Sequence, residues 1–342
     1  MSSKKENSVV IGFGHALPSY VVDNHYFERF LDTSDEWIRS RTGIVKRHFA
    51  LPALGETNAT LSVQAAQKAI QMAGLEAGDI DFIIGATLTA SEPMPSMACR
   101  VQSLLGLKDI FAFDLSAACS GFLFGLGVAD KFLQSGSHRT GLVIGTECLS
   151  SVANFRDRGT CVLFGDGSGA AVIQRKAQPK TMTQIKPFEC QMTSDGSLAE
   201  LLCLPAGGSD ILPTDSAYTA DNSKINMRGN ELFKVAVRCM KQSVLNCLQR
   251  ADISMDQINV LVPHQANERI IDRLCEELSF PANKVVKKID QVGNTSAASI
   301  PMACAMAIED GTLKSGDLVL SASFGGGLNF GACVFPVEFR NK

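Results

Sequence analysis

The stretch AGLEAGDIDFIIGAT (73–87) returns in weakened form as ADISMDQINVLVPHQ (251–265), at an offset of 178 residues. Two further pairs keep the same order: LQSGSHRTGLVIGTE (133–147) resembles LKSGDLVLSAS (313–323), and FGDGSGAAVI (164–173) resembles FGGGLNFGACVF (324–335). Two weakly similar halves in one chain indicate an ancient duplication. We therefore predict two similar halves, 1–178 and 179–342, packed on each other with a site at their junction, where ligand pockets often lie.

Helical and strand-like patterns alternate along both halves, which indicates the α/β class. In the first half we expect helices over 60–75, 95–106 and 119–134, and strands over 80–87, 110–115, 142–146 and 161–173. In the second half we expect helices over 228–250, 267–278 and 296–310, and strands over 258–262, 317–323 and 330–338.

Composition excludes several classes of protein. The net charge of −3 over 342 residues argues against a nucleic-acid binder, which needs a dense basic surface. The start MSSKKENSVVIGFG has no long apolar region, and no run of about 18 apolar residues occurs. We therefore expect no signal peptide, no membrane span and a cytoplasmic protein. The eleven cysteines are scattered without a C-x-x-C pair, so we expect reduced thiols rather than a disulfide framework or a zinc site.

One of these cysteines stands apart because of its surroundings. In FAFDLSAACSGFLFGL (111–126), an apolar strand ends, small residues follow, and Cys119 begins a helix. The unpaired N–H groups and the positive dipole end of that helix would lower the pKa of the thiol from about 8.5 towards roughly 3.5–7.5. The segment alone is equally compatible with a buried structural cysteine.

Two polar residues of the second half are candidates for the same site. His264 follows a buried strand in INVLVPHQANERI (258–270), and Asn294 precedes a helix in DQVGNTSAASIPMACAMAI (290–308). Taken singly, the histidine is more typical of a structural hydrogen bond and the asparagine of a helix N-cap. The duplication, however, places both at the junction that Cys119 faces.

Seven segments, in order, carry a resemblance to a known family. They are TSDEWIRSRTGI (33–44), DLSAACSGF (114–122), DRGTCVLFGDGSGAAV (157–172), MRGNELFKVAV (227–237), VPHQANERI (262–270), VGNTSAASIP (292–301) and SFGGGLNFG (323–331). The chain resembles β-ketoacyl-acyl carrier protein synthase III, the initiating condensing enzyme of type II fatty acid synthesis. The resemblance implies a thiolase-like fold, with the two halves in a layered αβαβα arrangement.

The resemblance also implies a chemistry. Cys119, His264 and Asn294 would be the catalytic triad. Cys119 would take an acyl group from an acyl-CoA, with acetyl-CoA the expected starter, and pass it to malonyl-acyl carrier protein with loss of CO2. Backbone N–H groups of Cys119 and Gly326 would form the oxyanion hole. The coenzyme A thioester is a substrate, and neither a metal nor a redox cofactor is expected.

Further residues receive roles only through the resemblance. Trp37 and Arg158 would sandwich the adenine of CoA, and Arg41 would contact a phosphate. Substrate contacts along the pantetheine are assigned to Gly229, Asn230, Phe233 and Asn267. Met94 and Phe324 are assigned to the acyl pocket, Met94 through a partner subunit of an expected homodimer.

A basic stripe is a candidate docking surface for the acidic carrier protein. Lys234, Arg238 and Lys241 are spaced i, i+4 and i+7, which places them on one helix face, and Arg269 extends the patch. A solvated helix face is an equally good interpretation.

The sequence departs from the family in two places, and alternatives stay open. Residues 206–223 form a longer, turn-rich loop, and Asn329–Phe330 replaces the usual Thr-Trp. The glycines of GFG (12–14) and FGDGSG (164–169) lack dinucleotide-binding spacing and are interpreted as tight-turn glycines. The alternatives are a specialised synthase or plain acyltransferase, a cysteine hydrolase, and a non-catalytic acyl-CoA binder. The starter, the carrier protein and the pathway are not determined by the sequence.

Overall fold

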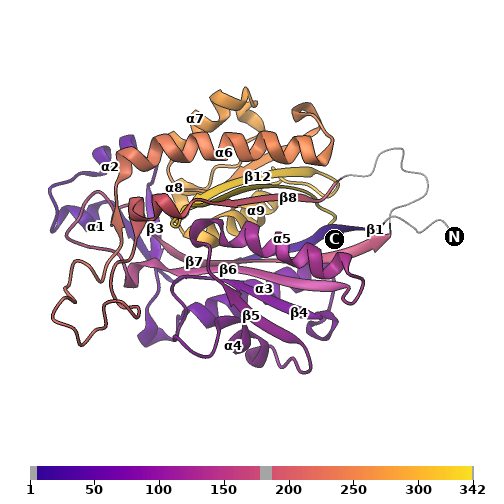
Figure 1. The fold of residues 1–342 in the computed structure, drawn as a ribbon, viewed down its shortest axis with the longest axis horizontal. Helices are drawn as coiled ribbons and strands as arrows, with labels where there is room; N and C mark the ends of the chain where they lie inside the picture. Colours follow the sequence, from indigo (N-terminus) through magenta and orange to yellow (C-terminus); the bar gives the residue numbers. More distant parts are fainter. Residues whose placement is uncertain (1–5, 178–186, 341–342) are drawn as a thin grey trace.

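Two sheets face each other across a central pair of helices (Figure 1). The computed structural model describes residues 6–177 and 187–340. The first sheet has the order β1 (Glu6–Ala16), β7 (Asp166–Ala177), β6 (Thr140–Cys148), β4 (Phe82–Ala86), β5 (Phe111–Leu115). The second has the order β11 (Val260–Pro263), β12 (Leu318–Gly325), β13 (Asn329–Pro336), β8 (Glu189–Ser194). Between them lie α5 (Gly121–Gln134) and α9 (Ser299–Glu309).

Helices also cover the outer face of each sheet. The first sheet is covered by α3 (Asn58–Ala73) and α4 (Met97–Leu104), and the second by α6 (Gly229–Ala251) and α7 (Glu268–Leu278). The layers therefore run α, β, α, β, α, and the predicted thiolase-like α/β architecture is confirmed (Figure 1).

Shorter elements connect these layers. They are α1 (His25–Glu28), α2 (Asp35–Thr42) and α8 (Ile289–Val292), the strand pair β2 (Tyr20–Asp23) and β3 (Lys46–Phe49), and the strand pair β9 (Leu202–Cys203) and β10 (Asn226–Met227). The 3₁₀ turns are Pro52–Leu54, Ala77–Asp79, Ala118–Ser120, Leu149–Ser151, Gly196–Leu201, Met255–Gln257, Ala282–Lys284 and Ser296–Ala298. No helix in 6–177 or 187–340 combines the length and apolar character that crossing a membrane requires.

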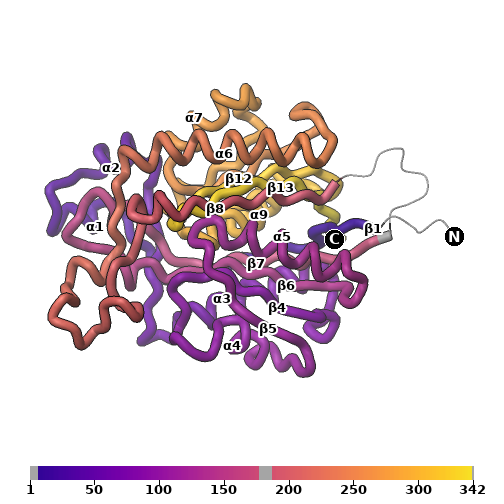
Figure 2. The backbone as a smooth tube through the Cα atoms, in the orientation of Figure 1, coloured from indigo at the N-terminus to yellow at the C-terminus, as the bar shows by residue number. Residues whose placement is uncertain are grey.

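The duplication is visible in the backbone at single-residue precision. The 3₁₀ turns Ala118–Ser120 and Ser296–Ala298, each leading into a central helix, are related by the offset of 178 found in the sequence. Both begin with a left-handed residue, Ala118 at φ 47° and Ser296 at φ 49°. In Figure 2 the indigo-to-magenta half and the orange-to-yellow half lie against each other. The predicted boundary between 178 and 179 lies outside the described residues.

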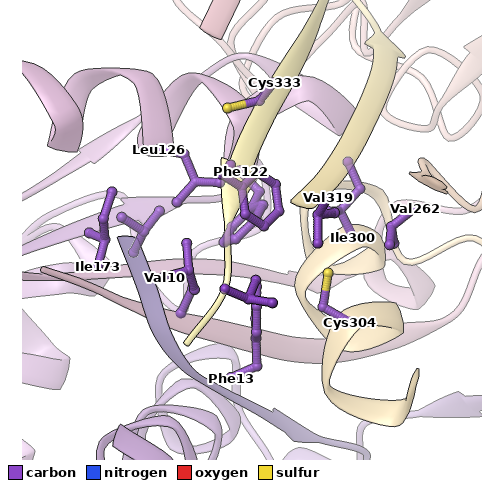
Figure 3. Packing of buried hydrophobic residues seen from close by; sticks show 14 of the residues in the cluster. Val10, Phe13, Phe122, Leu126, Ile173, Val262, Ile300, Cys304, Val319 and Cys333 are labelled. Atoms are coloured by element: carbon purple, nitrogen blue, oxygen red, sulfur yellow. The ribbon is translucent and has the colours of Figure 1, made fainter. Parts of the chain in front are cut away.

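Apolar side chains from both halves fill the space between the sheets. Figure 3 shows Phe13 and Phe122 from the first half packed with Ile300 and Val319 from the second. All four are almost fully buried, as is the rest of this central cluster. Because one core joins the halves, residues at their junction are held in a fixed relation to one another.

Three expectations about local structure are wrong. The predicted strand over 161–173 starts only at Asp166, because 161–165 turn and pair with the loop at Asn294 in the other half. The GFG and FGDGSG glycines lie mostly inside strands rather than in tight turns. A Cβ at Gly14 would lie 2.2 Å from the carbonyl oxygen of Ala65 in α3, so close packing requires these glycines.

The third correction concerns the cysteines. Cys190 of β8 and Cys333 of β13 are directly paired across the sheet and joined as a disulfide, with 4.2 Å between their Cα atoms. The other nine cysteines are free. The two partners are 143 residues apart, and the pairing of β8 with β13 that brings them together is a tertiary feature with no local signal.

Candidate active site

Cys119 lies where two cavities meet. It sits in the 3₁₀ turn between β5 and α5 and is buried, and its backbone is packed against β12: a Cβ at Gly325 would lie 2.5 Å from its nitrogen. One cavity of about 590 Å³ and another of about 350 Å³ are both lined by Cys119. A group attached to its sulfur can therefore extend to one side while a second molecule approaches from the other.

His264 and Asn294 line the larger cavity together with Cys119. His264 follows β11, and its backbone N–H donates to the carbonyl of Ala322 at 2.8 Å. Its Nδ1 is 2.6 Å from Oγ of Ser299, while its buried Nε2 has no hydrogen-bond partner in the described chain. The ring of Phe324 packs edge-on against the imidazole at 5.8 Å.

Asn294 is oriented by its own backbone neighbours. Its N–H donates to the carbonyl of Leu163 at 2.8 Å, which ties it to the other half. Its Oδ1 accepts from the N–H of Ser296 at 2.9 Å. With the carbonyl end of the amide occupied in this way, Nδ2 is the end that can donate to a substrate. The carbonyl end of the side chain therefore caps the 3₁₀ turn that leads into α9, in line with the N-cap interpretation, and the amide end is left for a second role.

Burial sets the protonation states, and one expectation is wrong. Burial raises the pKa of Cys119 to about 12, and a hydrogen bond from Ser296 only partly opposes this. The expected lowering of the thiol pKa is therefore wrong, because removal from water disfavours the charged thiolate and keeps Cys119 a thiol. Burial also lowers the pKa of His264 to about 3, which keeps the imidazole neutral.

Glu147 is a site residue that the sequence interpretation missed. Its carboxylate is fully buried and accepts from Oγ1 of Thr89 at 2.5 Å, from the N–H of Leu88 at 3.1 Å and from Oγ of Ser296 at 3.2 Å. Burial raises its pKa to about 7, and its charge in turn raises the pKa of Cys119. The signal that could have revealed it is an acidic residue within the apolar run LVIGTECL (142–149).

The residues assigned to CoA by resemblance line the larger cavity. They are Trp37, Arg41, Arg158, Gly229, Asn230, Phe233 and Asn267, with Lys234, Arg269 and Phe324 beside them. These positions come from five separate parts of the chain, and the fold brings them to the same cavity as the triad. Phe324 therefore lies on this side of Cys119, next to His264.

Trp37 and Arg158 already face each other. The guanidinium carbon of Arg158 is 5.1 Å from the centre of the indole ring, and Nη1 also donates to the backbone oxygen of Asp32. Two van der Waals gaps require about 7 Å, so an aromatic ring enters between them only if Arg158 moves outward. Asn267 is likewise engaged: its Oδ1 caps α7 at the N–H of Arg269, and its Nδ2 donates to the carbonyl of Arg41.

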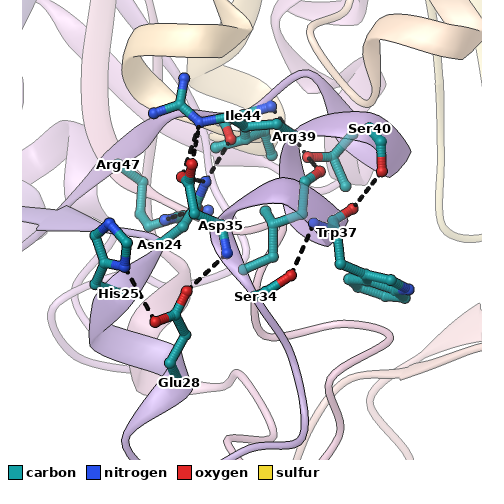
Figure 4. A network of polar contacts seen from close by, with 12 residues as sticks. Asn24, His25, Glu28, Ser34, Asp35, Trp37, Arg39, Ser40, Ile44 and Arg47 are labelled. Atoms are coloured by element: carbon teal, nitrogen blue, oxygen red, sulfur yellow. Dashed lines mark hydrogen bonds and ion pairs between the residues drawn. The ribbon is translucent and has the colours of Figure 1, made fainter.

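Helix α2 presents Trp37 on a well-anchored support (Figure 4). Oγ of Ser34 accepts from the N–H of Trp37 at 3.1 Å as an N-cap, and Asp35 forms an ion pair with Arg39. Asn24 donates to Asp35 and also accepts from the fully buried Arg47, which links α2 to the strand pair β2–β3. The indole is therefore held at the cavity by backbone anchored on both sides.

The smaller cavity is mostly apolar. Its lining includes Leu88, Leu149, Val152, Phe164, Leu202, Leu204 and Ile225, with the polar Thr89 and Ser296 and the glycines Gly326 and Gly327. Leu204 and Ile225 flank the 206–223 loop, whose base is closed by a hydrogen bond between Ala206 and Asn222. Met94 lines neither cavity of its own chain and is 83% exposed.

Only some residues of the basic stripe are available to contact a carrier protein. Lys234 and Arg269 lie at the larger cavity, and Arg238 lies between Lys234 and Lys241 on α6. Lys241 is paired with Glu277 at 2.8 Å. Across 6–177 and 187–340, no three His, Cys, Asp or Glu residues are grouped as a metal ion would require.

Comparisons with known proteins identify the family. Residues 113–196 match the family model of 3-oxoacyl-[acyl-carrier-protein (ACP)] synthase III, and residues 248–337 match that of its C-terminal region. A beta-ketoacyl-[acyl-carrier-protein] synthase III of Clostridium perfringens is 41% identical, with 97% of this chain and 100% of that protein covered. The Aquifex aeolicus relative is 44% identical, with 94% and 97% covered.

Solved structures give the same result. The crystal structure of 3-oxoacyl-[acyl-carrier-protein] synthase III from Aquifex aeolicus has a TM-score of 0.85 at 43% identity, covering 96% of this chain and 99% of that one. The priming β-ketosynthase of the R1128 polyketide pathway has a TM-score of 0.88 at 31% identity, covering 98% of each chain.

Proposed function

The chain belongs to the 3-oxoacyl-[acyl-carrier-protein] synthase III family, and from this premise we propose that Cys119, His264 and Asn294 condense an acyl-CoA with malonyl-acyl carrier protein. The observation that supports these roles is the shared cavity of about 590 Å³, where the three residues meet the assigned CoA contacts. The product is a β-ketoacyl-acyl carrier protein.

In the first step, the acyl group moves from CoA to Cys119. The sulfur attacks the thioester carbonyl, its proton passes to the unpartnered Nε2 of His264, and that proton leaves with the CoA sulfur as the C–S bond breaks. The backbone N–H groups of Cys119 and Gly326 are the proposed donors to the oxyanion. One such donor is typically worth about 3–4 kcal/mol of barrier.

In the second step, malonyl-acyl carrier protein loses CO2. The C–C electron pair forms an enolate, whose oxygen accepts hydrogen bonds from Nε2–H of His264 and Nδ2–H of Asn294. The enolate carbon attacks the thioester on Cys119, a C–C bond forms as the C–S bond breaks, and Cys119 leaves as a thiolate that takes a proton from water in the cavity. Thioester exchange and decarboxylation of a β-carbonyl acid involve no change of oxidation state that needs a redox cofactor.

The two cavities supply places for the two parts of the substrate. The smaller apolar cavity would hold the acyl chain, and the larger one the pantetheine arm, with the adenine between Trp37 and Arg158. Lys234, Arg238 and Arg269 would meet the acidic carrier protein at the opening, while Lys241 is held by Glu277.

We also propose that the protein is a homodimer and that it is cytoplasmic. β5 forms the outer edge of the first sheet, and all five of its residues are half-buried in the single chain. An unprotected edge carrying Phe111 and Phe113 is suited to pairing with a second copy, because the N–H and C=O groups on the side of β5 away from β4 lack strand partners. The mass in solution should then be twice the 36.6 kDa of one chain.

Intact-protein mass spectrometry tests the proposed roles. The wild type, incubated with separate acyl-CoAs, should gain an acyl mass that disappears when malonyl-acyl carrier protein is added. Cys119→Ala should gain none, whereas Cys304→Ala, a matched change at another buried cysteine, should behave as wild type. Asn294→Ala should still be acylated but condense about 10²–10³-fold more slowly. Acylation without carrier-dependent condensation in the wild type would favour a plain acyltransferase.

A further inference from the structure

Ser299 is the residue in contact with the far nitrogen of the catalytic imidazole. Its Oγ lies 2.6 Å from Nδ1 of His264, and each residue is 1% exposed. Ser299 is the first residue of α9, in the central layer, and His264 follows β11 of the second sheet. The contact therefore joins two elements of the packed core and leaves Nε2 as the ring nitrogen that can serve the reaction.

The two steps of the proposed reaction require opposite roles of Nε2 of His264, the ring nitrogen that does not contact Ser299. During acylation, Nε2 must offer a lone pair to the proton of Cys119. During condensation, the same Nε2 must carry a hydrogen to donate to the enolate oxygen. Because burial lowers the pKa of His264 to about 3, the ring is neutral before each step. A neutral imidazole carries one hydrogen, so the two steps need different tautomers.

Each tautomer needs a different partner at Nδ1. When Nε2 is the acceptor, Nδ1 carries the hydrogen and needs an acceptor beside it. When Nε2 is the donor, Nδ1 is a lone pair and needs a donor. A carboxylate or a backbone carbonyl would satisfy only the first state, and a backbone N–H only the second. A hydroxyl can do either by rotating its hydrogen.

We propose that Ser299 is a positioning residue that supports both tautomers of His264, accepting from Nδ1–H during acylation and donating to Nδ1 during condensation. The surroundings favour this role. Within residues 6–177 and 187–340, the contact of Nδ1 is the Ser299 hydroxyl and not a carboxylate. Burial is the cause of the lowered pKa of His264. The ring packs edge-on against Phe324, and the backbone of His264 is held in place by its hydrogen bond to Ala322.

The inference rests on the proposed function, and a pair of variants isolates the hydroxyl. Ser299→Thr keeps the hydroxyl and adds a methyl group; Ser299→Val has nearly the same shape as the threonine but no hydroxyl. Any steric cost of the added methyl group is common to both. Ser299→Ala removes the hydroxyl without adding volume, and Ser243→Ala, another serine that is 1% exposed, is the control for deleting a buried hydroxyl.

Single-turnover measurements then separate the two half-reactions. One follows acylation of Cys119 by acyl-CoA, and the other follows condensation of the preformed acyl-enzyme with malonyl-acyl carrier protein. We expect Ser299→Val to be about 10- to 100-fold slower than Ser299→Thr in both, and Ser299→Ala to be slowed in both by a similar factor relative to wild type. Ser243→Ala should match wild type, and KM for acyl-CoA should stay within about twofold throughout.

Different outcomes would overturn different statements. Equal rates for the threonine and valine variants would show that the hydroxyl has no role. Loss of only one half-reaction in both Ser299→Val and Ser299→Ala would show that Ser299 fixes a single tautomer, which also contradicts the proposal. Failure of wild type itself to acylate or condense would instead contradict the proposed function, and is distinguishable because it precedes any variant.

Discussion

Burial, rather than charge pairing, sets the chemical state of the two reacting groups. A thiol and a neutral imidazole in a desolvated junction avoid the cost of holding an ion pair away from water. Their resting states also leave Nε2 of His264 free to accept a proton when a thioester arrives. Acylation is then coupled to substrate binding, and a resting thiolate is not required.

This protonation state predicts how Cys119 reacts with an alkylating agent. With its pKa raised to about 12, the thiolate fraction should grow roughly tenfold for each pH unit up to at least pH 10. The measurement is the rate of iodoacetamide addition to Cys119 followed by mass spectrometry, with Cys119→Ala to assign the adduct. A rate that is already level by pH 7 would mean that the resting group is a thiolate.

Glu147 predicts a pH dependence of stability. Its folded-state pKa of about 7 is above the ordinary 4.5, so the folded protein binds the proton more tightly than the unfolded chain. The contribution of Glu147 to the free energy of unfolding is complete below about pH 4.5 and is lost as pH rises through 7. The free energy of unfolding changes by about 3 kcal/mol in total. Glu147→Gln does not titrate, so its free energy of unfolding should lack this component.

The measurement compares the two proteins by denaturant unfolding between pH 5 and 8.5. The wild type should lose stability relative to Glu147→Gln across this range, while the other titrating groups cancel in the difference. If the free energies of unfolding of the two proteins change in parallel with pH, the carboxylate of Glu147 has an ordinary pKa, which its hydrogen bonds to Thr89 and Ser296 hold down.

At the scale of elements, periodicity was enough to predict most of the long helices and strands, because apolar residues recur in them at helical or strand spacing. No range was predicted for β1, β8, α2 or the short strand pairs. α3 and α6 begin and end within two residues of the predicted ranges 60–75 and 228–250. The segment 161–165 was mistaken for strand because it is apolar, yet it is buried by the loop of Asn294 rather than by a ladder.

The residues of the proposed triad could be named from three quoted motifs, and they do share one cavity. The groups that contact them could not be named in this way. Ser299 lies within a quoted motif and Glu147 within an apolar run, but their contacts, like the Cys190–Cys333 pair, depend on which strands and helices become neighbours. The proton state of Cys119 was misjudged because burial depends on packing from the other half.

Helix α2 carries a prediction about substrate binding. Base stacking on an aromatic side chain is typically worth about 1–3 kcal/mol, so Trp37→Ala should raise KM for acyl-CoA about 5- to 100-fold with little change in kcat. The control substrate is the corresponding acyl-pantetheine, which lacks the nucleotide and should show no change in KM. An equal rise with both thioesters would mean that Trp37 supports α2 rather than binding the base.

At the scale of the whole molecule, the two halves together form the smaller cavity, which is the proposed acyl cavity. Leu149 and Val152 come from the first half, and Leu202, Leu204 and Ile225 from the second. The volume of about 350 Å³ compares with about 30 Å³ for one water molecule in the liquid. An acetyl group would fill only a small part of it. The junction of the two halves therefore positions the proposed triad and would also set the volume that is available to the starter acyl group.

This space predicts a starter range wider than acetyl. Straight acyl-CoAs of about four to six carbons should load Cys119 at least as fast as acetyl-CoA, because each added methylene buried in an apolar cavity contributes about 0.8 kcal/mol. Leu204→Trp should narrow the cavity and slow hexanoyl loading by tenfold or more while leaving acetyl loading unchanged. Leu212→Trp, at a similarly exposed leucine within the 206–223 loop but outside the cavity lining, is the matched control. Rapid loading by acetyl-CoA alone would mean that the cavity is closed to longer chains in the working enzyme, as a partner subunit's loop around Met94 would do, and the starter would then be the acetyl group expected from the sequence.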